Sequence, residues 1–183
     1  SGCYDRIDMA DKAMEYSQIA LPLFITLGDK EGEARCYLLR AKSYATFGDT
    51  SKQAEYTFKG LELAISIKNL RLQQKFYNNL SNYYQSVMND NDKAIEYMHI
   101  STEIAMQLKD YRLQIINYNN LGIIYTYKKD YNKAMEYLHL AEETNEKYVN
   151  DDLLKSYCIM YIGCVYFYQE KYGSTLYGLS KLR

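Results

Sequence analysis

The chain of 183 residues is 48% hydrophobic and 25% charged and contains a single proline, which is typical of a folded protein and excludes a disordered one. Its formal net charge of −1 argues against nucleic-acid binding, because a nucleic-acid surface needs a basic stripe. No apolar stretch reaches the ~20 residues that a membrane-crossing helix needs, so we expect no membrane insertion by this segment.

Three series of residues recur at intervals of 40 or 41 positions. One series follows an Ala-x-Glu-Tyr pattern or a close variant, and its tyrosines are Tyr16, Tyr56, Tyr97, Tyr137 and Tyr177, the last with Leu176 in place of the glutamate. A second series is Tyr44, Tyr84, Tyr125 and Tyr166, and three positions before its members lie small residues, namely Ala41, Ser81, Gly122 and Gly163. The third is Asp29, Asn69, Asp110 and Asp151. Three series with one period predict a protein built from repeats.

Each period holds two helix-spaced apolar segments of about 17 residues, so each repeat is predicted to be a pair of helices. The first helix, around residues 9–24, lacks a partner, and Pro22 should kink or end it. The units are approximately residues 1–28 (a half repeat), 29–68, 69–109, 110–150 and 151–183 (incomplete). We therefore predict a single all-α repeat domain, 1–183, with about nine helices, and expect it to be a fragment of a longer protein.

The turns and the helix crossings have their own signals. The Asp and Asn residues of the third series can accept hydrogen bonds from the N–H groups that open the next helix. Gly122 and Ala134 should mark the point where two antiparallel helices approach most closely, because such an approach needs a small side chain. Tyr125 and Tyr137 should then fill the space on either side of this crossing.

Residues 118–141, YNNLGIIYTYKKDYNKAMEYLHLA, resemble the tetratricopeptide repeat (TPR). The matching positions are Tyr118, Leu121, Gly122, Tyr125, Asp130, Ala134, Tyr137 and Ala141. The period of 40–41 residues is similar to a longer variety found in bacterial signalling regulators. The resemblance implies a right-handed superhelical solenoid of antiparallel helix pairs, a fold that serves as a general binding platform.

The resemblance also implies a concave groove lined by the first helix of each pair. The groove residues that it implies here are Lys42, Lys75, Asn78, Asn79, Asn82, Gln85, Asn119, Asn120, Ile123, Tyr127, Tyr161 and Tyr168. The same face includes Arg35, Leu38, Thr126, Tyr157, Met160, Cys164 and Phe167. Asparagine side chains can hold the N–H and C=O groups of a bound peptide, and the aromatic residues suit an apolar anchor side chain. Alternatively, the asparagines bond within the solenoid, and the aromatic residues pack on a further repeat or dimerise.

Signals for catalysis are weak in this sequence. His99 and His139 share a repeat position but have no local third metal ligand. The recurring glutamates, such as Glu55, follow a lysine by three positions, as in exposed Lys–Glu pairs. No phosphate-binding, dinucleotide-binding or nucleophile-elbow motif is present. We expect no enzymatic activity, no cofactor and no metal.

The spacing of the cysteines indicates the cellular compartment of the protein. Cys3, Cys36, Cys158 and Cys164 form no C-x-x-C pair, which favours idle thiols in a reducing compartment, so we expect a cytoplasmic protein. The opening "SGCYD" also resembles the end of a bacterial lipoprotein signal, which leaves open a periplasmic or lipid-anchored part of a membrane sensor. An expression-tag scar before an ordinary cysteine is the other interpretation.

These observations favour a non-enzymatic module that binds a peptide or protein segment. We expect it to be the sensor or scaffold region of a larger bacterial signalling or transcriptional regulator. The alternative is a structural module that self-associates through its uncapped ends and has no peptide ligand.

Overall fold

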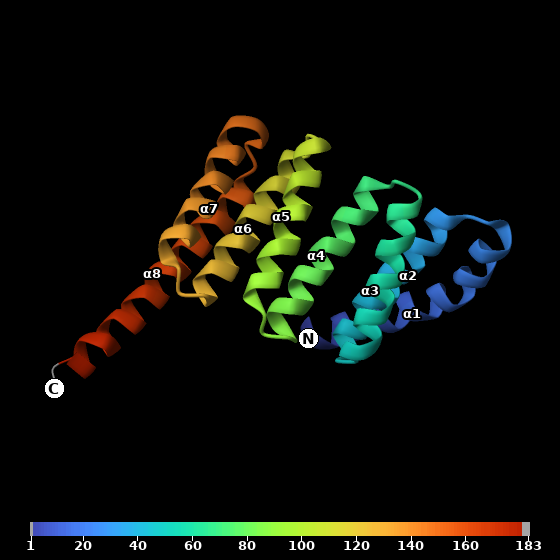
Figure 1. Cartoon of the computed structure of the whole chain (residues 1–183), viewed down its shortest axis with the longest axis horizontal. Coiled ribbons are helices and arrows are strands. Elements are labelled where there is room, and N and C mark those ends of the chain that lie inside the picture. The colour runs from blue at the N-terminus through green and yellow to red at the C-terminus, as the bar shows by residue number, and fades with distance from the viewer. Residues whose placement is uncertain (1, 181–183) are drawn as a thin grey trace. The chain divides into compact units, whose positions relative to one another are not determined.

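A computed structural model describes the backbone of residues 2–180 and the side chains of residues 7–170. Within residues 2–180 the secondary structure is entirely helical, which confirms the predicted all-α class (Figure 1). The helices are α1 (Gly2–Leu27), α2 (Lys30–Phe47), α3 (Thr50–Ser66), α4 (Leu70–Ser86), α5 (Asn91–Gln107), α6 (Tyr111–Tyr127), α7 (Tyr131–Thr144), the π-helical η1 (Asn145–Val149) and α8 (Asp152–Ser180).

The chain divides into two compact units, unit 1 (Ser1–Asn89) and unit 2 (Asp90–Arg183). In unit 1, α1 packs on α2, α2 on α3 and α3 on α4. Its buried side chains include Leu38, Leu61, Phe76 and Leu80. In unit 2, α5 packs on α6, α6 on α7, and α8 on both α6 and α7. The buried side chains of this unit include Met98, Ile115, Leu138 and Val165.

Seven short turns follow one pattern, in which a residue with positive φ precedes a helix-capping residue. The residues with positive φ are Gly28, Gly48, Lys68, Asn89, Lys109, Lys129 and Asn150. The next residue is always Asp or Asn, and its side chain accepts a hydrogen bond from the first turn of the following helix. The predicted caps at Asp29, Asn69, Asp110 and Asp151 are confirmed, because each carboxylate or carboxamide satisfies an N–H group that has no partner within the helix.

The two helices with the least regular sequences are longer than expected. α1 continues past Pro22 to Leu27, so the proline does not end it. Pro22 is exposed, so water can satisfy the helix carbonyl that loses its bonding partner. α8 likewise continues to Ser180, although we expected a ninth helix to begin within that range. No Asp or Asn cap occurs between positions 169 and 180, so the local signal that ends every earlier helix is missing there.

The crossing of α6 and α7 has the predicted close approach. A Cβ added at Gly122 would lie 2.6 Å from Cγ of Leu138 and 3.3 Å from the backbone oxygen of Ala134. The rings of Tyr125 and Tyr137 stack beside this point, with centroids 5.5 Å apart and planes at 7°. The tyrosines therefore fill the space between paired helices, as the sequence predicts.

Two of the lysines that begin second helices, Lys52 and Lys133, lie over tyrosine rings, which differs from the predicted Lys–Glu pairing. Lys52 Nζ lies 5.1 Å from the ring centroid of Tyr44, and Lys133 Nζ lies 5.4 Å from that of Tyr125. Glu55 forms its ion pair with Lys59 instead, at 2.6 Å. An ammonium group over a tyrosine ring is attracted by the negative face of the π system, so these lysines cover the tyrosine stacks.

Candidate functional site

A hollow in unit 2 lies between α6 and α8. It has a volume of about 250 Å³ and is lined by Gly122, Ile123, Thr126, Tyr127, Leu138, Tyr161, Cys164 and Tyr168. We call this hollow the α6–α8 pocket. None of these eight residues is charged, and most of the exposed lining is apolar. Such a surface suits an uncharged, mainly hydrophobic group.

The pocket exists because one side chain is missing from its floor. Gly122 has no Cβ, so the side chain of Leu138 from α7 reaches the space between α6 and α8. Elsewhere the two helices are tied together, since Arg112 forms an ion pair with Asp151 at 2.8 Å. The pKa of Asp151 is lowered because its carboxylate is stabilised, mainly by the Leu154 N–H and to a smaller extent by Arg112.

Aromatic side chains form the walls of the α6–α8 pocket. The rings of Tyr127 and Tyr168 lie 6.3 Å apart at 57°, so they face each other from α6 and α8. Tyr157 and Tyr161 lie 6.4 Å apart on consecutive turns of α8. Burial raises the pKa of the Tyr161 phenol above its ordinary value. The walls therefore offer flat apolar faces with hydroxyl groups at their edges.

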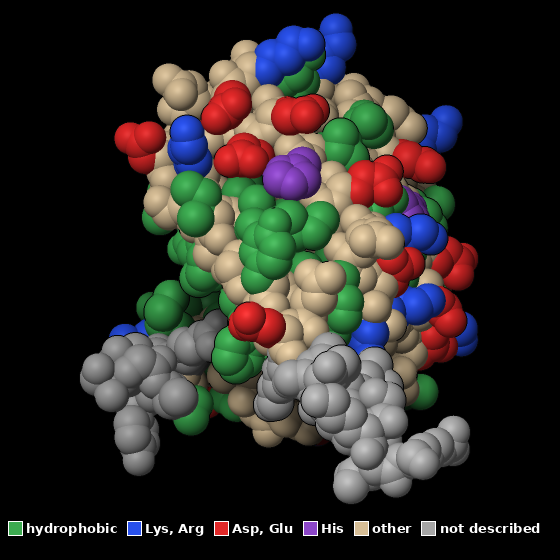
Figure 2. Space-filling view, turned by 90° about the vertical axis from the view of Figure 1, so that its left-hand side faces the viewer, with side chains coloured by type: hydrophobic (Ala, Val, Ile, Leu, Met, Phe, Trp, Pro, Cys, Tyr) green, Lys and Arg blue, Asp and Glu red, His purple; other side chains and the backbone are tan. Residues whose placement is uncertain are grey.

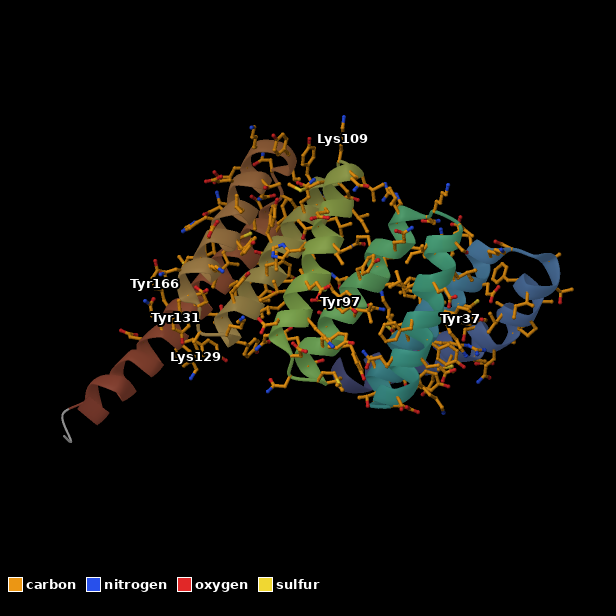
Figure 3. All side chains as sticks on the ribbon, in the orientation of Figure 1. Tyr37, Tyr97, Lys109, Lys129, Tyr131 and Tyr166 are labelled. Carbon is orange, nitrogen blue, oxygen red and sulfur yellow. The ribbon has the colours of Figure 1, made fainter. Side chains whose placement is uncertain are left out.

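A contact from α7 holds this end of α8 in place. The Tyr131 hydroxyl donates a hydrogen bond to the backbone oxygen of Tyr168, at 3.4 Å. Figure 3 labels Tyr131, the first residue of α7. Phe167 also packs its ring edge-on to Tyr168, at 5.8 Å. Tyr168 is thus fixed by its neighbours, which limits the conformational entropy that ligand binding would cost at this wall.

The structure brings together four of the twelve predicted groove residues, Ile123, Tyr127, Tyr161 and Tyr168, around the α6–α8 pocket. Asn120 lies half-buried on α6, one turn before Ile123. Asn119 is only 4% exposed, and within the described residues its Oδ1 is buried without a hydrogen-bond partner. Asn119 is therefore enclosed within the helix packing and does not line the pocket.

The other predicted groove residues belong to unit 1. Lys42 is exposed on α2, and the remaining five lie on α4, namely Lys75, Asn78, Asn79, Asn82 and Gln85. The Asn82 amide donates a hydrogen bond to Asn78 Oδ1 at 3.3 Å, so these two side chains bond along their own helix. A separate hollow of about 340 Å³ in unit 1 is lined by Glu33, Tyr37, Lys59, Glu62, Leu63 and Ser66.

Two pocket residues, Gly122 and Leu138, were outside the predicted face. The repeat pattern places Gly122 at the helix crossing, and Leu138 lies on a second helix, whereas the groove residues are expected on first helices. The sequence did contain a signal for both. A residue without a side chain on one helix exposes whatever lies beneath it on the next, and Leu138 follows Ala134 by one helical turn.

Cysteine and histidine side chains are dispersed in the described part of the chain. Cys36 and Cys158 are buried free thiols, and burial raises the pKa of both. Cys164 is an exposed free thiol, and Cys3 lies outside the residues whose side chains are described. Residues 7–170 contain no cluster of three or more His, Cys, Asp or Glu that could hold a metal ion. Among the described helices, none is both long and apolar enough to cross a bilayer.

Solved structures with the same arrangement identify the fold. No protein-family model and no curated protein sequence matches this chain. BtubC (BKLC) from P. vanneervenii has a TM-score of 0.68 at 17% identity, and the match covers 93% of this chain and 85% of BtubC. A P. anserina protein described as a kinesin light chain with nearly identical TPR-like repeats has a TM-score of 0.65 at 12% identity, covering 98% and 92%. The chain therefore has a TPR-like helical-repeat fold.

Proposed function

We propose that this chain is a non-enzymatic binding module that captures a peptide or protein segment, with the α6–α8 pocket holding an apolar side chain of the ligand. The observation that carries the proposal is the uncharged, tyrosine-walled pocket over Gly122 and Leu138. Its volume of about 250 Å³ is large enough for one leucine or aromatic side chain. The TPR-like fold supports this proposal, because helical-repeat folds present extended binding surfaces.

The neighbouring polar group would hold the ligand's main chain. The carboxamide of Asn120 is partly accessible and lies one helical turn from Ile123, at the pocket edge. A carboxamide both donates and accepts hydrogen bonds, so it can pair with peptide N–H and C=O groups whatever the sequence. An anchor side chain in the pocket with main-chain bonds beside it would favour a short extended segment. We further propose that the module belongs to a larger bacterial signalling or transcriptional regulator, where binding would be the sensing event.

Binding can be tested with a peptide array followed by isothermal titration calorimetry on the best peptide. Tyr161→Ala and Tyr168→Ala each remove one wall of the pocket and should weaken binding by at least about tenfold, as expected for a buried aromatic contact. Tyr148→Ala is the matched control, because Tyr148 is 49% exposed in the same unit but does not line the pocket. Equal affinities for all three variants and the parent protein would exclude the pocket as the binding site.

The thiol of Cys164 gives an independent measurement of occupancy. It is exposed and lines the pocket, whereas Cys36 and Cys158 are buried. In a Cys3→Ser background, iodoacetamide should therefore modify Cys164 first. Saturating peptide should slow this reaction at least about tenfold if it fills the pocket, and an unchanged rate would place the peptide elsewhere.

A further inference from the structure

The hollow in unit 1, which we call the α2–α3 pocket, plays no part in the proposed function. It has a volume of about 340 Å³, and its whole lining lies inside the described part of the chain. α2 contributes Glu33 and Tyr37 to the lining, and one face of α3, at positions 59, 62, 63 and 66, contributes the rest. The lining holds the carboxylates of Glu33 and Glu62 against the single ammonium group of Lys59, whereas the lining of the α6–α8 pocket is uncharged.

The α2 wall of this pocket is held between two neighbouring helices. Glu33, Tyr37 and Arg40 are spaced by four and three positions, so they share one face of α2. Arg40 donates hydrogen bonds to Ser17 Oγ on α1 at 3.2 Å and to the Tyr56 hydroxyl on α3 at 3.3 Å. The ring of Tyr37, which Figure 3 labels, lies 5.9 Å from that of Tyr56. The wall is therefore fixed in place by contacts on both sides.

The hydrogen-bond donors of the lining side chains already donate to groups of the protein. The Tyr37 hydroxyl donates to Glu33 Oε1 at 2.8 Å, and the Ser66 hydroxyl donates to a backbone oxygen of α3 at 2.8 Å. Lys59 directs its ammonium group to Glu55, which lies 2.6 Å away and outside the lining. Burial and then the bond to Glu33 raise the pKa of Tyr37 to about 12, so the phenol keeps the proton that it donates.

The acceptors of the lining, in contrast, remain open. Within the described residues the Glu62 carboxylate is exposed and forms no hydrogen bond or ion pair. Among the same residues, Glu33 is half-buried and accepts a bond through Oε1 but none through Oε2. The last turn of α3, which includes Leu63 and Ser66, carries no basic residue to balance the negative end of the helix dipole. The pocket therefore suits a cation that is rich in N–H donors.

Glu33 departs from the repeat in a way that helix packing does not require. Its repeat position is occupied by Gln73 in α4 and by Gln114 in α6. Each glutamine donates a hydrogen bond from Nε2 to a backbone oxygen of the preceding helix, at 3.2 Å and 3.3 Å respectively. An ionised glutamate has no proton to donate, so α2 gives up this bond between helices. An acidic side chain at a position where packing favours glutamine indicates a role in binding.

The matching part of unit 2 already holds a cation of its own. Lys147 occupies the repeat position of Ser66, and Leu140 occupies that of Lys59. Lys147 Nζ lies 5.0 Å from the ring centroid of Tyr148. Figure 2, which looks at the side of the molecule with α8, shows acidic and basic side chains next to one another. The open carboxylates of the α2–α3 pocket are thus not a general property of the repeat.

We propose that the α2–α3 pocket binds an alkylguanidinium group, the side-chain end of arginine, through the carboxylates of Glu33 and Glu62. A guanidinium group is planar and has five N–H donors, which match the open carboxylate oxygens. The Tyr37 ring and Leu63 form the apolar part of the lining, and they would contact the flat cation and its methylene stem. An ammonium group has three donors and no flat face, so a lysine side chain should bind more weakly.

A titration of the full chain with small guanidinium compounds, followed by ¹⁵N-edited NMR, tests this proposal. N-acetylarginine N-methylamide should shift the amide signals of residues 33–37 and 59–66 with a dissociation constant of about 1–10 mM, as expected for a ligand with few contacting atoms. The lysine counterpart should bind at least about threefold more weakly, and the uncharged citrulline counterpart should not saturate the site. The site lies in unit 1, so its failure would leave the α6–α8 pocket untouched, and the reverse also holds.

Free arginine, titrated in parallel, identifies the source of the guanidinium group. Similar affinities for free arginine and the blocked compound would indicate an arginine side chain of a protein partner. An affinity for free arginine at least about tenfold higher would indicate the amino acid itself, and both results support recognition of the guanidinium group.

Variants of the two carboxylates complete the test. Glu62→Gln and Glu33→Gln should each weaken binding at least about fivefold, because each removes one charged acceptor. Glu33→Gln should keep the helix content in circular dichroism, since α4 and α6 carry glutamine at this position. Glu31→Gln is the matched control, because Glu31 pairs with Arg35 at 2.6 Å outside the lining, and it should bind as the parent does. Parent affinity in either pocket variant, saturable binding of the citrulline compound, or shifts confined to other residues would overturn the proposal.

Discussion

Tyr125 and Tyr137 lie face to face across the α6–α7 crossing, with ring centroids 5.5 Å apart and planes at 7°. Their contact joins two helices and is covered by Lys133 on one side. Burial raises the pKa of Tyr137, so the phenol stays neutral well above physiological pH. The stack is therefore an uncharged, largely apolar junction, and it should contribute to stability beyond the area that each ring buries.

A double-mutant cycle measures this contribution. Tyr125→Leu, Tyr137→Leu and the double variant should show a coupling of about 0.5–1.5 kcal/mol in the free energy of unfolding. Chemical denaturation followed by circular dichroism gives the four values. Tyr125→Phe is the control, because it keeps the ring and should retain most of the coupling. Additive single changes would mean that the two rings contribute only through burial.

Two glycines at one repeat position should respond to alanine in opposite directions. A Cβ at Gly122 would lie 2.6 Å from the fully buried side chain of Leu138, so Gly122→Ala should lower the free energy of unfolding by about 1–3 kcal/mol. A Cβ at Gly163 meets no atom within 4 Å, so Gly163→Ala should raise it by about 0.5–1 kcal/mol through helix propensity. Thermal unfolding of both variants decides the comparison, and equal shifts would contradict the close crossing at Gly122.

The turn before α6 holds a lysine in an unfavourable conformation. Lys109, which Figure 3 labels, has φ of 52°, a region that non-glycine residues avoid because Cβ crowds the backbone. Lys109→Gly should therefore raise the free energy of unfolding by about 0.5–1 kcal/mol. Gly48→Ala is the reverse change at an equivalent turn with φ of 77°, and it should lower stability by about 1 kcal/mol. Urea denaturation measures both, and a loss of stability in Lys109→Gly would show that contacts of the lysine outweigh its backbone strain.

His99 should make stability depend on pH. Burial beside Tyr137 lowers its pKa below 6.5, with the carboxylate of Glu103 opposing this change and Lys133 adding to it. The unfolded chain then binds a proton that the folded chain does not, so the free energy of unfolding should fall as the pH drops below about 6.5 and level off below the folded-state pKa.

Replacement of the histidine tests this dependence. His99→Gln should flatten the fall in stability between about pH 6.5 and 5 in urea denaturation at a series of pH values. His139→Gln is the matched control, because His139 has the same repeat position but is exposed, and the slope should persist in that variant. If the free energy of unfolding still fell between these pH values without His99, the pH dependence would arise from carboxylate groups.

Local signals in the sequence were sufficient to predict most of the helices and turns of the fold. Asp29 and Asp110 cap helices because the cap is a contact between residues three positions apart, and such a contact can be read from spacing. The Gly122 crossing was predictable because it repeats with the period. The unbroken length of α8 was not predictable. The last repeat matches the pattern only in part, and the absence of an Asp or Asn cap, which favours a continuous helix there, conflicted with the repeat period, which favours a turn.

The candidate site was predictable only in part. Tyr161 and Tyr168 follow from the repeat position, which fixes the face of the helix on which they lie. The burial of Asn119 depends on how closely α8 approaches α6, and no pattern along one helix determines that distance. Lys133 lies over Tyr125 although a glutamate is available three positions away, because cation–π attraction across the hairpin competes with an exposed ion pair of small net value.

Gly122 determines both the packing of α6 against α7 and the shape of the α6–α8 pocket. The absent methyl group lets α7 approach α6, and it also opens the depression above Leu138. Any larger residue at this position would push the helices apart and fill the cavity at the same time. A substitution at position 122 would thus change the packing of the helices and the proposed site together, whereas a substitution of Tyr127, which is 59% exposed, would change the site with less effect on packing.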